Sequence, residues 1–83
     1  MNENLLALNK LPIGSIGIVK ELTLDGPIRR RILDLGLIYN TNVKSLGESP
    51  SGDPIAYEIR GATIALRSEE SSQILVEPIF HKE

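Results

Sequence analysis

Between Gly26 and Asn42 the chain reads GPIRRRILDLGLIYNTN, and this stretch contains its best candidate for a helix. Pro27 suits the first turn, where a backbone N–H has no intrahelical partner, and Gly36 suits the stop. We therefore predict one short helix from about Pro27 to Leu35. A one-sided helix of about ten residues is marginally stable alone in water, so the rest of the chain must supply the surface on which it packs.

The apolar side chains of this helix gather on one face. With about 100° between successive residues, Ile28, Ile32 and Leu35 fall within one narrow arc. Arg30 and Asp34 point away from that arc, and their i,i+4 spacing suits an ion pair. We expect the arc to lie on the core, with Ile32 at its centre.

Length and composition indicate one small domain. The chain has 83 residues, a formal net charge of −2 and no cysteine. A chain of this length forms one hydrophobic core, and the lack of cysteine excludes disulfides and thiolate metal sites. No apolar run approaches the ~18 residues of a membrane span. We therefore expect a single soluble, cytoplasmic domain over residues 1–83, without membrane insertion and with residues 81–83 as a frayed tail.

Segments with the alternation of β-strands lie on both sides of the helix. The predicted strands run from about Ser15 to Leu22, Val43 to Leu46, Ile55 to Ile59, Ile64 to Leu66 and Ile74 to Ile79. A short apolar turn from Leu5 to Leu11 precedes them. Five short strands and one short helix predict a mainly β fold, a small and strongly bent barrel with the helix over one open end.

Residues between these segments indicate how the chain turns. A slip in the alternation predicts a β-bulge near Gly17, and Gly61 predicts a tight hairpin with positive φ. Pro78 predicts an edge position for the last strand, because proline cannot donate to a ladder. Ser68 is placed to cap one short helical turn. The loop from Gly47 to Pro54 is rich in Gly, Pro and Ser, and we expect it to be the most exposed and most mobile loop.

Residues able to carry catalysis or bind metal are scarce. His81 is the only histidine and stands near the end of the chain, so we interpret it as a solvated tail residue rather than a ligand. Glu48 and Asp53 flank a loop, but they lack the oxygen-rich spacing of a calcium site. No nucleophile has a base beside it. The sequence therefore predicts no catalytic residue, no cofactor and no tight transition-metal site, which makes an enzyme the least supported class.

The helix also carries the run Arg29-Arg30-Arg31. These side chains spread over about 200° of the helix, so one interpretation is a solvated, salt-bridged face. The other is a partner-binding surface formed by Arg29, Arg30, Leu33 and Leu37, in which apolar groups outside the core arc are ringed by arginine. Both interpretations stay open at this point. Nucleic-acid binding is disfavoured, because the net charge is negative and aromatic side chains are few.

Several short motifs occur together in an order and spacing that resemble the FeoA family. They are Leu8 to Gly14 with Ile16, then Arg30-Arg31-Ile32-Leu33-Asp34-Leu35-Gly36-Leu37, then Pro50 with Gly52-Asp53-Pro54, then Arg60-Gly61 with Ile64-Ala65-Leu66-Arg67, and finally Glu70 with Ile74 and Val76. The resemblance covers Leu5 to about Val76. Tyr39-Asn40 stand where Pro-Gly is common, and Ser71 stands where alanine is usual. Asn40 tolerates left-handed φ, so we expect the turn to persist.

The resemblance implies an SH3-like barrel and a role other than catalysis. FeoA proteins are small cytoplasmic accessory proteins of the bacterial ferrous-iron transport system. The implied partner is the cytosolic, GTPase-bearing part of the ferrous-iron permease, and the family is also associated with transition-metal binding. The alternative is a stand-alone metal- or peptide-sensing regulatory module related to the C-terminal domain of iron-dependent repressors. A repressor would need a helix-turn-helix before this domain, and Met1 stands only four residues before the start of the resemblance. The docking face and the oligomeric state stay open.

Overall fold

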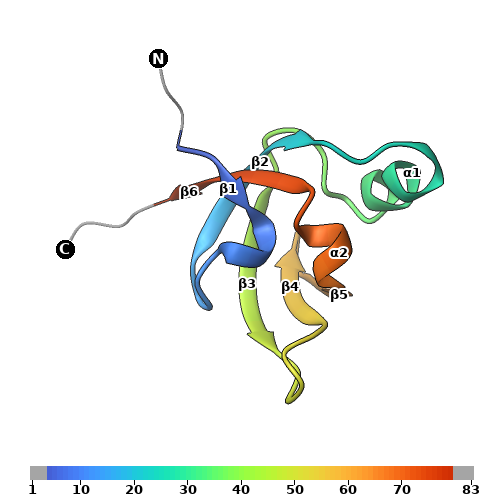
Figure 1. Ribbon diagram of the computed structural model, residues 1–83. Helices are drawn as coiled ribbons and strands as arrows, with labels where there is room; N and C mark the ends of the chain where they lie inside the picture. Colours follow the sequence, from blue (N-terminus) through green and yellow to red (C-terminus); the bar gives the residue numbers. More distant parts are fainter. Residues whose placement is uncertain (1–3, 80–83) are drawn as a thin grey trace.

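The computed structural model describes residues 4–79. In chain order the elements are β1 (Leu6–Ala7), the 3-10 helix η1 (Leu8–Lys10), β2 (Ile16–Leu22), α1 (Gly26–Asp34), β3 (Asn42–Glu48), β4 (Ile55–Ile59), β5 (Ala62–Leu66), α2 (Ser68–Ser71) and β6 (Ile74–Ile79). Figure 1 follows them along the chain. The prediction of a mainly β fold with one substantial helix is confirmed.

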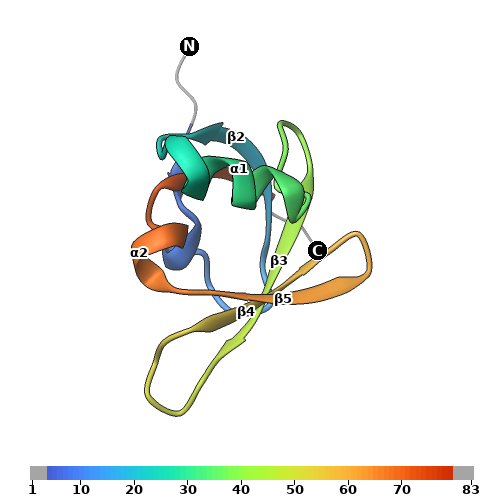
Figure 2. The same cartoon turned by 90° about the vertical axis from the view of Figure 1, so that its right-hand side faces the viewer.

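The strands form one antiparallel sheet in the order β1-β6-β2-β3-β4-β5. The sheet bends strongly and encloses the core, as the turned view in Figure 2 shows. Its outer strands β1 and β5 do not pair with each other, so the barrel is loose rather than closed. The sequence predicted five of the six strands. The additional strand is β1, which has two residues and stands where we expected an apolar turn.

Two details of the predicted sheet are wrong. The register of β2 against β6 shifts between Val19 and Glu21 rather than at Gly17. Gly17 instead allows β2 to pack closely on β6, because a Cβ there would lie 2.8 Å from Cγ2 of Val76. The last strand, β6, is also not an edge strand, since it lies between β1 and β2. It tolerates Pro78 because β1 pairs only with Leu75 and Val76, which leaves that side of Pro78 without a strand.

Helix α1 ends as its sequence predicts. Gly36 has φ of 105° and follows the last turn, and its N–H donates to the carbonyl of Leu33 at 2.9 Å. The N–H of Leu37 donates to the carbonyl of Ile32 at 3.3 Å. This pair of bonds is a Schellman motif, in which the residue after the glycine turns back toward the helix. It brings Leu37 into the core beside Ile32.

Only the C-terminal part of α1 reaches the core. Ile32 is completely buried and Leu35 packs against the core cluster, as predicted. Ile28 is 49% exposed, so its assignment to the core is wrong. Residues 26–31 are all exposed. The first turn of α1 therefore extends beyond the surface on which the later turns pack, and this position exposes Ile28.

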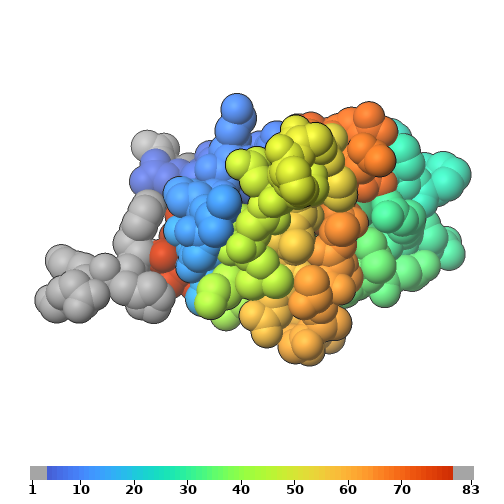
Figure 3. Space-filling model, turned by 90° about the horizontal axis from the view of Figure 1, so that it is seen from below, coloured from blue at the N-terminus to red at the C-terminus, as the bar shows by residue number. Residues whose placement is uncertain are grey.

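The loop from Gly47 to Pro54 is less exposed than its composition suggested. Most of its residues are half-buried, and the hydroxyls of Ser49 and Ser51 donate to the carbonyl of Asp53 at 2.8 and 3.0 Å. The Asp53 carboxylate accepts from the backbone N–H of Ser68 at 2.9 Å. In the space-filling view this yellow loop lies beside the orange segments of the chain (Figure 3). Our expectation of the most exposed loop is therefore wrong, because hydrogen bonds tie it to α2.

Helix α2 is also capped differently from the prediction. Its N-cap residue is Arg67 rather than Ser68, and the Glu70 carboxylate accepts from the N–H of Arg67 at 3.2 Å. Glu69 and Glu70 lie in the first turn, where the positive end of the helix dipole favours acidic groups. The hairpin turn between β4 and β5 is confirmed, with positive φ at both Arg60 and Gly61.

Across residues 4–79 no helix has the length and apolar character needed to cross a bilayer.

Candidate partner-binding groove

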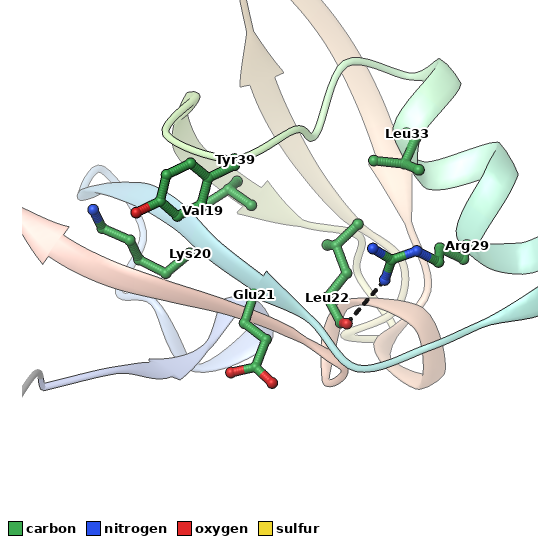
Figure 4. A pocket seen from close by; sticks show the side chains of 7 residues that line it. All are labelled: Val19, Lys20, Glu21, Leu22, Arg29, Leu33 and Tyr39. Carbon is green, nitrogen blue, oxygen red and sulfur yellow. Dashed lines mark hydrogen bonds between the residues drawn. The ribbon is translucent and has the colours of Figure 1, made fainter.

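A surface groove of about 340 Å³ lies between β2 and α1. We call it the α1–β2 groove. Its lining residues are Val19, Lys20, Glu21, Leu22, Arg29, Leu33 and Tyr39. Figure 4 shows that Leu33 and Arg29 descend from α1, whereas Tyr39 and Lys20 approach from the other end of the groove. The groove therefore combines apolar side chains with two cations.

Arg29 is held by backbone carbonyls at the α1 end of the groove. One nitrogen of its guanidinium, Nη1, donates to the carbonyl oxygens of Leu22 at 3.0 Å and Leu24 at 3.4 Å. These carbonyls belong to the end of β2 and to the segment that leads into α1. Arg29 thus fixes the position of the helix relative to β2 and keeps its charge at the edge of the groove.

Lys20 and Tyr39 form the opposite end of the groove. The Lys20 ammonium donates to the side-chain carbonyl of Asn40 at 3.0 Å and lies 3.8 Å from the Glu77 carboxylate. It also lies 5.2 Å from the centre of the Tyr39 ring, a distance typical of a cation–π contact. Asn40 has φ of 69°, so the expected left-handed turn is present without the usual Pro-Gly. Tyr39 remains 67% exposed.

The four residues predicted as a partner-binding surface do not all lie together. Arg29 and Leu33 line the groove, and Arg30 is exposed on the adjoining face of α1. Leu37 is completely buried in the core, so its assignment to a surface is wrong. Tyr39 was not among the predicted residues, and its only signal in the sequence was its departure from the family pattern.

Two ion pairs also differ from expectation. Arg31 pairs with the Glu70 carboxylate and so ties α1 to α2, a contact that the sequence did not predict. Among the described residues, the charged groups of Arg30 and Asp34 are not within ion-pair distance of each other. Arg30 therefore keeps its charge available to a partner.

A small buried polar cluster lies under α2. Tyr57 and Ser71 are completely buried, and the Ser71 hydroxyl donates to the carbonyl of Arg67 at 3.2 Å. This bond satisfies the hydroxyl of Ser71, the residue that stands where alanine is usual in the FeoA family. The Tyr57 hydroxyl has no hydrogen-bond partner within the described part of the chain. Burial is the main influence on the pKa of Tyr57 and raises it. The nearby Ser71 hydroxyl lowers this pKa, although the two hydroxyls do not form a hydrogen bond, and the charge of Asp53 raises it further.

The raised pKa of Tyr57 predicts a loss of stability in alkaline solution. The folded protein holds the phenolic proton more tightly than the unfolded chain, whose tyrosine titrates near 10.0. The contribution of Tyr57 is therefore fully present below that pH and is lost as pH rises through the folded-state pKa. We expect the free energy of unfolding of wild type to fall relative to Tyr57→Phe between neutral pH and about pH 11. Urea denaturation measures this difference, with Tyr39→Phe as the exposed control, and a pH-independent difference would contradict the assignment.

Metal ligands do not converge in the described part of the chain. No group of three His, Cys, Asp or Glu residues within residues 4–79 is arranged to hold a metal ion. His81 lies outside the described residues. The prediction that the protein lacks a tight transition-metal site therefore stays a prediction. We expect calorimetric titration with Fe²⁺ or Zn²⁺ to show no stoichiometric submicromolar binding, and such binding in a His81→Ala variant would contradict it.

A strongly bent antiparallel sheet of short strands with one packed helix defines a small SH3-like domain. The family model of the FeoA domain matches residues 6–78. The chain belongs to the FeoA domain family, which is linked to Fe(2+) transport.

Known proteins show how far this relationship extends. The NMR structure of an FeoA-like protein from Clostridium acetobutylicum has a TM-score of 0.87 and 34% identity, over 100% of this chain and 95% of that one. A fusion of Fe(2+) transport protein A with the Fe(2+) transporter FeoB, from Porphyromonas gingivalis, is 28% identical over 74 residues. That match spans 89% of this chain but only 9% of the fusion protein. A manganese-dependent transcriptional repressor has a TM-score of 0.84 at 20% identity, over 95% of this chain and 44% of that one. At this identity the likeness concerns the fold alone.

Proposed function

We propose that this protein is an accessory module of ferrous-iron transport that binds the cytosolic, GTPase-bearing region of the transporter through the α1–β2 groove and the adjoining face of α1. The observation that carries the proposal is the Porphyromonas fusion, because there an FeoA part and FeoB share one chain. Proteins fused in one organism often act together when they are separate in another. Action through binding rather than catalysis also agrees with the scarcity of catalytic groups in the sequence.

The chemistry of the α1 face supports this partner role. Leu33 is half-buried and lines the groove, and it does not belong to the group that packs against the core. Arg30 is exposed, and no described carboxylate pairs with it. Interfaces are enriched in arginine and aromatic groups around an apolar centre, and Tyr39 adds an exposed ring at the far end of the groove. The expected partner surface is acidic and partly apolar.

The second interpretation is a regulatory module related to repressor domains. The shared fold supports it, but no feature of the α1–β2 groove does. The two interpretations differ in their partner. A regulatory module that senses metal or peptide would not need the transporter's cytosolic region.

We expect Leu33→Ala and Arg30→Glu to weaken binding of the transporter's cytosolic domain by about tenfold or more. The thermal midpoint should change little, because neither side chain belongs to the core cluster. Calorimetric titration of the purified proteins, with and without guanine nucleotide, measures the affinity. Lys10→Glu, a charge reversal at an exposed lysine of η1, is the matched control and should bind as wild type does.

Each outcome of this titration has a distinct meaning. Unchanged affinity in both variants would contradict an interface on α1, and the loop from Gly47 to Pro54 would become the leading candidate. Loss of binding with an equal loss of thermal stability would show that Leu33 belongs to the core. Absence of binding by wild type in either nucleotide state would overturn the proposed function.

A further inference from the structure

We propose that the α1–β2 groove accepts an extended, acidic peptide segment of the partner, which adds as a short strand to the free edge of β2 and places a carboxylate on Arg29. The inference rests on the proposed function, because it names the kind of segment that the transporter's cytosolic region would supply. Three observations carry it: an unpaired stretch of strand, the direction of its peptide groups, and the charge along the groove.

Strand β2 is paired along its length on one side but only along its first part on the other. It pairs with β6 from Ile16 to Leu22, but its ladder with β3 covers only Ile16 to Ile18. Val19 is still satisfied on that side, since its N–H donates to Thr41 and its carbonyl accepts from Asn40, at 2.9 and 2.7 Å. Beyond Val19, no described strand pairs with residues 20–22 on the side that faces α1. The α1–β2 groove runs along this unpaired edge.

The peptide groups of Leu22 point into the groove. Its carbonyl oxygen accepts from Arg29 on α1 at 3.0 Å, and Figure 4 shows this contact. In an antiparallel ladder the N–H and C=O of one residue face the same neighbour, so the N–H of Leu22 also points toward the groove. A carbonyl oxygen has two lone pairs, and Leu22 can therefore keep its bond to Arg29 and still accept from an added strand. An extended backbone is the ligand that matches this donor and acceptor.

The charges in the groove favour an acidic segment. Among the described residues, only Nη1 of Arg29 donates hydrogen bonds, so the other N–H groups of the guanidinium can meet a carboxylate. At the other end, the Lys20 ammonium lies 3.8 Å from the Glu77 carboxylate, so Arg29 is the main cation offered to the segment. Glu21 is the one acid in the lining, and Figure 4 shows its carboxylate turned away from Leu33 and Tyr39. Those two side chains flank the edge, where they can contact alternate apolar side chains of the added strand.

Hydrogen exchange of the complex tests strand addition directly. The transporter's cytosolic domain is added at saturating concentration to ¹⁵N-labelled protein, and exchange of individual amides is followed by NMR. We expect the Leu22 amide to slow by about tenfold or more, because it acquires a hydrogen-bond partner. Amides of β5, the long outer strand of the sheet, serve as the control and should exchange as in the free protein.

A charge variant provides the second readout. We expect Arg29→Met to bind about tenfold more weakly, whereas Lys10→Met, which removes one exposed charge elsewhere, should bind as wild type does. If Arg29→Met fails to fold, the exchange of Leu22 in wild type still decides the question. Binding without protection of Leu22, or with protection of β5 instead, would overturn strand addition while the proposed function stands. Absence of any binding would overturn both.

Discussion

Replacing Ile32 by alanine should lower the free energy of unfolding by about 2–5 kcal/mol. Ile32 is completely buried and belongs to the core cluster with Leu37 and Ile59. Alanine at this position removes buried apolar contacts and leaves a cavity that the surrounding strands fill only in part. Urea denaturation monitored by circular dichroism measures the change.

Ile28→Ala is the matched control, since it is the same substitution one helical turn earlier. Ile28 is 49% exposed, so its replacement should cost well under the loss at Ile32. Equal losses in the two variants would mean that the first turn of α1 packs on the core after all. A loss below about 1 kcal/mol for Ile32→Ala would mean that α1 packs through a different face.

The second large effect is expected at Leu37. Leu37→Ala should also cost about 2–5 kcal/mol, because Leu37 is completely buried beside the C-terminal end of α1. The loss should exceed that of Leu33→Ala, whose side chain lines the groove. Comparing Leu33→Ala with Leu37→Ala therefore separates an effect on binding from an effect on stability at the C-terminal end of α1. Denaturation gives the stability, and calorimetry with the cytosolic domain gives the affinity.

The expected pattern is opposite in the two variants. Leu33→Ala should reduce affinity with little change in stability, whereas Leu37→Ala should reduce stability, and the remaining folded protein should bind as wild type does. If Leu37→Ala leaves stability unchanged and abolishes binding, the original assignment of Leu37 to the surface is right and the buried position is wrong.

The error at Leu37 shows which sequence signal we did not use. Gly36 was recognised as the end of the helix, and a glycine at that position often starts a Schellman motif. In that motif the residue after the glycine contacts the residue three positions before the cap, which here joins Leu37 to Ile32. Leu37 was instead grouped with Leu33 as an apolar residue outside the core arc, which placed it on the surface. The capping motif predicts the buried position.

Other features depended on neighbours that a single sequence does not reveal. The period-two alternation was sufficient for β2, β4 and β6, because each has one face on the core. It could not predict β1, which has only two residues and forms by pairing with Leu75 and Val76. The exposure of Ile28 likewise depends on how far α1 extends beyond the core. The pairing of Arg31 with Glu70 joins residues far apart in sequence and required the relative position of the two helices.

The groove itself could be predicted only in part. Arg29 and Leu33 were proposed from their place on the helix, and the structure puts both in its lining. The contributions of Lys20 and Tyr39 come from β2 and the turn before β3, and they meet α1 only in the folded sheet. The hydrogen bonds that hold Arg29 to Leu22 and Leu24 are also tertiary contacts, which no local pattern encodes.

Chemical-shift mapping of the complex tests the central claim, that the α1–β2 groove binds the transporter's cytosolic region. The labelled protein is titrated with that domain, with and without guanine nucleotide, and backbone amide shifts are followed by NMR. We expect the largest changes in residues 20–22, residues 29–33 and Tyr39. Changes confined to the loop from Gly47 to Pro54 or to the outer surface around Lys44, or no change in either nucleotide state, would contradict it.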